Sequence, residues 1–102
     1  MPTTTSKVLF RGAATTTVGT TLYTVPASTT TVVTSIIVTN TSASAGTFTL
    51  ALAGTNFGTT IAVGGNDSTV IDLKQTLVAT NTITGGASAT TINFHISGVE
   101  IA

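Results

Sequence analysis

Hydrophobic and polar residues alternate along much of the chain, most regularly over residues 47–53. Phe48, Leu50 and Leu52 fall on one side of that segment, and threonines and alanines fall on the other. A period of two is typical of a β-strand with one buried face. Breaks in the alternation coincide with Gly, Pro, Asn and Asp, which favour turns. The pattern predicts strands at residues 7–11, 18–25, 30–39, 47–53, 59–63, 68–74, 77–83 and 89–101.

The number and spacing of these segments predict the fold class. About eight short strands at roughly 8–12-residue intervals indicate an all-β protein, a β-sandwich or jelly roll of antiparallel strands. A chain of 102 residues is the size of one domain, which we place at residues 7–102. Residues 1–6 are polar and rich in threonine, and we expect them to form a flexible N-terminal arm.

Two of the predicted strands have unusual patterns. Residues 30–39 are partly apolar on both faces, which favours a central strand covered on each side. The expected faces are Val32, Thr34, Ile36 and Val38 on one side, with Val33, Ser35, Ile37 and Thr39 on the other. In the last strand, Val99 and Ile101 fall out of phase with Ile96, and a bulge at Ser97-Gly98 would restore the phase. The predicted core is Phe48, Leu50, Ile36, Val38, Ile92, Phe94 and Ile96.

Charge is scarce in this chain and limits the possible partners. Charged residues make up 6% of the sequence, and the formal net charge is zero. Nucleic-acid binding is disfavoured because no basic stripe could neutralise phosphates. Proteins near zero net charge tend to associate, so the composition favours a component of an assembly. The start of the chain lacks the apolar segment of a secretory signal, and no apolar run is long enough to span a membrane, so we expect synthesis in a cytoplasm.

Candidates for nucleophilic catalysis are few. The chain has one histidine, His95, which Asp67 or Asp72 could orient towards one of the many serines and threonines. His95 lies mid-strand between Asn93 and Ser97, away from any nucleophile elbow. The pattern favours a partly exposed strand histidine, and we assign no catalytic residue and predict that the chain is not an enzyme.

Oxygen ligands for a hard cation occur together at residues 65–68 (GNDS), with Asp72 nearby. Calcium needs 6–8 oxygens, whereas Asn and Asp are also the residues that a tight turn requires. The turn is the favoured interpretation, and we predict no metal and no cofactor. Asp67, Asp72 and Glu100 are also too few to imply a glycosidase pair. Carbohydrate binding is disfavoured, because it generally uses exposed aromatic side chains as platforms. The chain has a single tyrosine, Tyr23, and no tryptophan.

Two further patterns carry weak signals. Residues 40–42 (NTS) and 66–68 (NDS) match the glycosylation sequon, which matters only in a secreted eukaryotic protein. The pairs Thr47/Thr49 and Thr82/Thr84 are similar to those of ice-binding β-proteins. Such proteins need a regular repeat, which this chain lacks.

Four segments in order resemble small virion proteins of tailed bacteriophages. They are residues 22–27 (LYTVPA), 38–42 (VTNTS), 67–73 (DSTVIDL) and 94–101 (FHISGVEI), so the resemblance extends over roughly residues 18–101. It implies a β-sandwich built into a phage particle, with no catalytic residues to carry over. Proteins of this group act as decoration or cement proteins on heads, or as parts of necks and tails.

Composition and resemblance together define the expected function. We expect a capsid decoration or cement protein on the outer surface of the virion, with the major capsid protein or other virion proteins as its partners. A neck, tail or fibre component is the alternative, and a carbohydrate- or ice-binding module is a third possibility. Because little charge opposes self-association, we also expect a homo-oligomer, with a trimer favoured by the local threefold axes of a shell.

Overall fold

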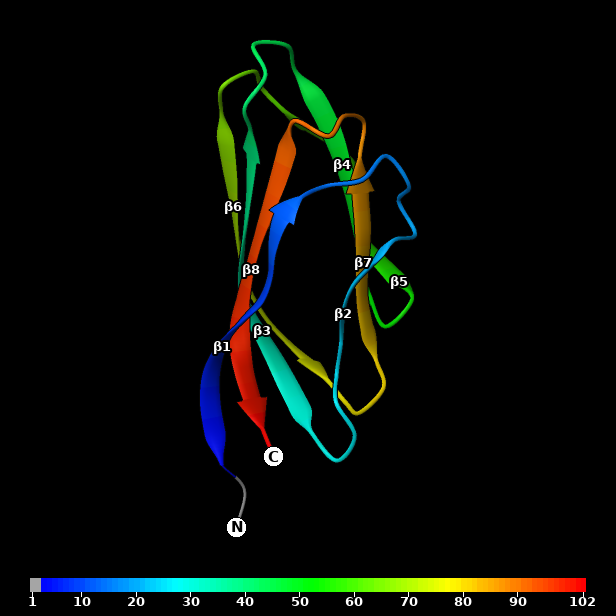
Figure 1. Cartoon of the computed structure of the whole chain (residues 1–102), viewed down its shortest axis with the longest axis vertical. Coiled ribbons are helices and arrows are strands. Elements are labelled where there is room, and N and C mark those ends of the chain that lie inside the picture. The colour runs from blue at the N-terminus through cyan, green and yellow to red at the C-terminus, as the bar shows by residue number, and fades with distance from the viewer. Residues whose placement is uncertain (1–2) are drawn as a thin grey trace.

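The structure is a computed structural model that describes residues 3–102, and it consists of strands, turns and loops (Figure 1). The all-β prediction is confirmed: eight antiparallel strands form two four-stranded sheets. The described residues include no helix that could cross a membrane. The strands are β1 (Thr4–Ala13), β2 (Thr21–Thr24), β3 (Thr30–Asn40), β4 (Gly46–Leu52), β5 (Thr55–Val63), β6 (Ser68–Leu77), β7 (Thr82–Ala87) and β8 (Ile92–Ile101).

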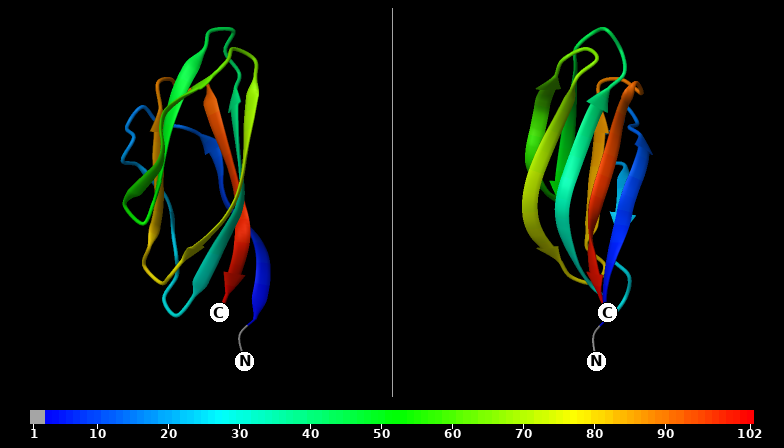
Figure 2. Two further views of the ribbon diagram at one scale, coloured as in Figure 1. Left: turned by 180° about the vertical axis from the view of Figure 1, so that it is seen from behind. Right: turned by 90° about the vertical axis from the view of Figure 1, so that its left-hand side faces the viewer.

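The strand order is that of a jelly roll. One sheet has the order β1-β8-β3-β6, and we call it the terminal sheet because it contains the first and last strands. The second sheet has the order β2-β7-β4-β5. Every connection between consecutive strands passes from one sheet to the other, except the β4–β5 hairpin. The two sheets face each other along an elongated molecule of 48 × 21 × 18 Å (Figure 2).

The core lies between the sheets and contains the residues that the alternation predicted. Phe48, Leu50, Ile36, Val38, Ile92, Phe94 and Ile96 are all buried. Phe48 of the second sheet meets Phe94 of the terminal sheet edge to face, with ring centroids 6.2 Å apart and an interplanar angle of 73°. This geometry is a favoured arrangement of two aromatic rings and joins the two layers at the centre of the sandwich.

The predicted faces of β3 are only half correct. Its interior position, between β8 and β6, is confirmed. However, the register shifts between Val33 and Ser35, which places Val33 with Ile36 and Val38 in the core. Val32 and Ile37 consequently face away from the second sheet. The prediction that both faces are covered is wrong for the described chain, since Ile37 remains 38% exposed.

The prediction of a bulge at Ser97-Gly98 is wrong, because the irregularities lie in the two strands that flank β8. Register shifts occur in β1 between Val8 and Phe10 and in β3, while β8 keeps its alternation and turns Gly98 towards the core. A Cβ at Gly98 would lie 2.4 Å from the carbonyl oxygen of Val32, so only glycine fits this close approach. Gly98 thus takes an inward position in β8 without adding a side chain to the core, and Val99, the next residue, faces outward.

We expect Gly98→Ala to destabilise the protein by about 1–3 kcal/mol, because the added methyl would overpack the contact between β8 and β3. Thermal unfolding followed by circular dichroism measures the effect. Gly19→Ala is the matched control, since a Cβ at Gly19 would meet nothing within 4 Å. If both variants melted together with the wild-type protein, the close-approach explanation of Gly98 would be refuted.

The flexible arm predicted at residues 1–6 requires correction. Residues 1–2 lie outside the described residues, but β1 already begins at Thr4, which pairs with Ile101. The Thr3 amide donates to the carbonyl oxygen of Ala102 at 2.6 Å, and the Ala102 amide returns a bond to Thr3 at 3.0 Å. Polar side chains suggested an arm, but the backbone pairing with β8 needs no apolar side chains.

The strand predicted at residues 77–83 is also wrong. β6 continues to Leu77, a turn containing Thr80 at a φ of 71° follows, and β7 starts at Thr82. β7 then passes through Gly85-Gly86, which the sequence suggested as a strand end. A Cβ at Gly85 would lie 2.5 Å from the Leu50 side chain, so this glycine permits close packing inside the strand.

The strand predicted at residues 59–63 begins earlier, at Thr55. Its hairpin with β4 needs only Ala53 and Gly54, whose φ values of 51° and 80° are those of a type I′ turn. This tight turn matches the twist of the flanking strands and leaves no residues for a longer loop.

Candidate functional site: a polar cluster and an outer sheet face

His95 and Asp72, two of the residues considered for catalysis, do not come together. His95 lies on β8 and Asp72 on β6, with β3 between them. In the register of the sheet, His95 is level with Ile37 and Val70, so Asp72 is both two strands away and two residues further along. Neighbouring strands lie about 4.8 Å apart, which places the two groups on the order of 10 Å apart at the backbone. His95 and Asp72 therefore do not form a direct hydrogen bond.

Residues 65–68 form the turn that the sequence favoured. Asn66 has a positive φ of 53°, and its amide donates to the Ser42 carbonyl oxygen at 2.8 Å. The Asp67 carboxylate accepts a 2.8 Å hydrogen bond from the amide of Ser68. Within residues 3–102, no three His, Cys, Asp or Glu side chains gather in the manner of a metal site.

The two sequons differ in accessibility. Asn40 is buried, and its side-chain amide donates to the Ser44 carbonyl oxygen at 2.8 Å while its carbonyl accepts from the Ser42 amide at 3.0 Å. These bonds hold the β3–β4 loop, so Asn40 serves a structural role. Asn66 is exposed in its turn.

The threonine pairs lie on adjacent strands, β4 and β7, at different levels. Thr49 is opposite Gly86, and Thr84 is opposite Ala51. Because glycine and alanine interrupt the row, the threonines do not form a continuous ladder.

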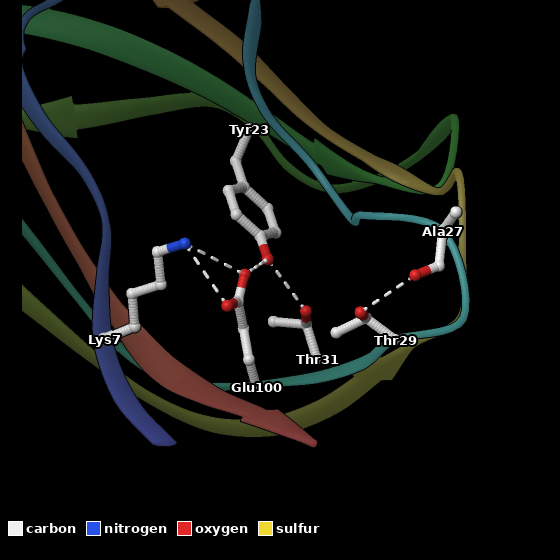
Figure 3. Close-up of polar contacts among 6 residues, drawn as sticks. All are labelled: Lys7, Tyr23, Ala27, Thr29, Thr31 and Glu100. Carbon is white, nitrogen blue, oxygen red and sulfur yellow. Dashed lines mark hydrogen bonds and ion pairs between the residues drawn. The ribbon is translucent and has the colours of Figure 1, made fainter. Parts of the chain in front are cut away.

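A polar cluster joins the two sheets near the chain termini (Figure 3). The Tyr23 hydroxyl, from β2 of the second sheet, donates to the Glu100 carboxylate on β8. The Lys7 ammonium on β1 lies 3.2 Å from the same carboxylate, and Thr31 on β3 is 2.9 Å from the Tyr23 hydroxyl. Sequence reasoning missed this cluster, since nothing in the local pattern around Tyr23 or Glu100 indicates that they meet.

The cluster fixes the charge of its members. The hydrogen bond from Tyr23 holds the pKa of Glu100 below its ordinary value, and the Lys7 ammonium acts in the same direction against the opposing effect of burial. Burial and the hydrogen bond to Glu100 raise the pKa of Tyr23. The carboxylate thus stays ionised and the phenol stays neutral near pH 7. A neutral phenol and a weakly basic carboxylate suit a clasp between the sheets better than proton transfer.

The clasp predicts a pH-dependent stability. Because the pKa of Glu100 is lower in the folded protein than its ordinary value of 4.5, the ionised carboxylate stabilises the fold. This stabilisation is complete at pH values above the ordinary pKa, and it is lost as the pH falls through the lowered pKa. We expect the melting temperature of the wild-type protein to drop in that acidic range, and Glu100→Gln to flatten the drop. Asp72→Asn, which removes an exposed carboxylate, is the control and should retain the wild-type profile. A Glu100→Gln profile that also matched the wild type would contradict this role.

The outer face of the terminal sheet is the other candidate site, and it is seen directly in the right-hand view of Figure 2. It exposes three large apolar side chains on three strands: Val8 (45%), Ile37 (38%) and Val70 (63%). An open hollow, lined by Val8, Thr34 and Val99 among others, lies beside the register shifts of β1 and β3. A broad sheet face with exposed aliphatic side chains is suited to contact with another protein surface.

Comparisons with known proteins support the fold. The sequence matches no protein-family model and no curated protein sequence. The structure is similar to a chain of the IBDV particle described as "Crystal structure of the T13 IBDV viral particle reveals a missing link in icosahedral viruses evolution". The TM-score is 0.60 at 9% identity, and the match covers 98% of this chain but 30% of the IBDV chain. At this identity the likeness establishes a shared fold.

Proposed function

We propose that this protein is a non-enzymatic structural component of a virus particle. The observation that carries the proposal is the exposed aliphatic outer face of the terminal sheet, on a jelly roll that is similar to a chain of a viral particle. The sequence resemblance to small phage virion proteins favours the same role. The separation of His95 from Asp72 agrees with it, because the side chains do not assemble a catalytic site there.

The specific role that we propose is capsid decoration. The protein would lie on the outer surface of a tailed-phage head, as a homotrimer that contacts the major capsid protein and stabilises the shell. A face that exposes Val8, Ile37 and Val70 can cover apolar patches on a shell, and its charged side chains Arg11 and Asp72 can meet polar groups there. Many weak contacts of this kind, repeated over a symmetric shell, add up to substantial reinforcement.

Heat release of the genome tests the role. Particles produced without this gene are heated in the presence of a DNA-binding dye, with and without addition of the purified protein. We expect the particles that lack the protein to release DNA at a lower temperature, and the added protein to restore the original temperature.

The outcomes separate the alternatives. Unchanged heat release together with lost tail attachment or adsorption would favour a neck, tail or fibre component. Unchanged heat release and full infectivity would reject the virion role, and a glycan array and an ice-recrystallisation assay would then address the third possibility.

A further inference from the structure

The two edge strands of the terminal sheet are long and lack partners on their outer sides. β1 pairs only with β8, and β6 pairs only with β3. Across residues 3–102, backbone hydrogen bonds outside the ladders do not reach the free side of either strand. Each strand has ten residues, so each presents a row of unpaired donors and acceptors that could bind another strand.

The exposed side chains of the two edges are complementary. β1 presents Val8 and Arg11, and β6 presents Val70 and Asp72. All four are exposed on the outer face of the sheet. One edge therefore combines an aliphatic side chain with a cation, and the other combines an aliphatic side chain with an anion, Asp72, which the exposed Lys74 follows two residues later.

The strand directions allow these edges to meet. Because the four strands are all antiparallel, β1 and β6 run in opposite directions. A second copy placed alongside in the same orientation would thus present its β1 antiparallel to β6 of the first copy, which continues the sheet without a break.

The register brings the complementary groups together. Across the sheet, Arg11 is level with Val70, and Val8 is level with Asp72. In a copy placed level with the first, Arg11 becomes a diagonal neighbour of Asp72, and Val8 becomes a diagonal neighbour of Val70. Long side chains on the same face reach such diagonal neighbours.

We propose that β1 of one copy pairs with β6 of the next, through main-chain hydrogen bonds and an Arg11–Asp72 ion pair. The interface is heterologous, so it closes into a ring only when the rotation between neighbouring copies divides a full turn, and it extends into a filament otherwise. The identification of that ring with the trimer rests on the proposed function, whereas the edge pairing itself does not.

Charge exchange in the purified protein tests the pairing. The association constant is measured by sedimentation velocity over a range up to tens of micromolar. We expect Arg11→Asp and Asp72→Arg each to weaken association by about tenfold or more, and the double exchange Arg11→Asp/Asp72→Arg to restore most of it. Thr16→Asp, an exposed change in the connection between β1 and β2 and outside both edge strands, is the control and should not weaken association.

Three results would overturn the inference. The first is a wild-type monomer over the whole concentration range, and the second is a double exchange that associates as weakly as the single ones. The third is stronger association after Arg11→Ser and Asp72→Ser, which would mean that these charges protect the edges from pairing. Since the experiment uses no particles, it can fail while the heat-release experiment succeeds, and the reverse also holds.

Discussion

Phe94→Ala is expected to leave the chain unfolded or insoluble. Phe94 is fully buried on β8, and its ring packs against Phe48 across the sandwich. Truncation of a buried phenylalanine costs about 3–5 kcal/mol, and a small domain has only about 5–15 kcal/mol in total. The loss also removes the aromatic contact that joins the two sheets. Chemical denaturation of the soluble fraction measures the change in unfolding free energy.

The chain provides a matched control for this prediction. Phe57 lies on β5 and is 39% exposed, so Phe57→Ala makes the same chemical change outside the core. We expect Phe57→Ala to lower the unfolding free energy far less than Phe94→Ala. If both variants lowered the unfolding free energy equally, burial of Phe94 would not be a major source of the protein's stability.

Ile37→Lys is expected to abolish binding of the protein to a particle that lacks it. Ile37 lies on β3, an inner strand of the terminal sheet, so a lysine there would be enclosed by the shell. Burial of a charge costs several kcal/mol, of which a diagonal ion pair with Asp72 on β6 offsets about 0.2–1 kcal/mol, so we expect the affinity to fall by about a hundredfold or more. Co-sedimentation of labelled protein with particles measures the affinity.

Val78→Lys is the control for the binding experiment. Val78 is 58% exposed in the turn between β6 and β7, away from the outer face. This variant adds the same charge, and we expect it to bind like the wild-type protein. If Ile37→Lys bound equally well while both variants kept their melting temperatures, the outer face would not be the contact surface.

The sequence predicted the architecture well because alternation depends on local burial. The seven predicted core residues are buried because each follows a period of two within one strand. The errors arise where close backbone approach overrides the pattern. Gly85 appeared to end a strand, and Gly98 appeared to require a bulge within β8, but both glycines instead allow neighbouring groups to approach closely.

The candidate surfaces could not be predicted, because they depend on contacts distant in the sequence. Tyr23 and Glu100 meet only after β2 and β8 are placed in opposite sheets. The outward position of Ile37 depends on the register shift beside Thr34, which no local signal reveals. By contrast, the turn at residues 65–68 was recognisable, because Asn and Asp favour such turns through their own local hydrogen bonds.

The number of copies of this protein per purified particle tests the central claim most directly. Quantitative mass spectrometry, with isotope-labelled peptides of this chain and of the major shell protein, gives that number. A symmetric decoration of the head predicts on the order of hundreds of copies, in fixed ratio to the shell protein. Complete absence of the protein from purified particles would contradict its role as a structural component of the virion.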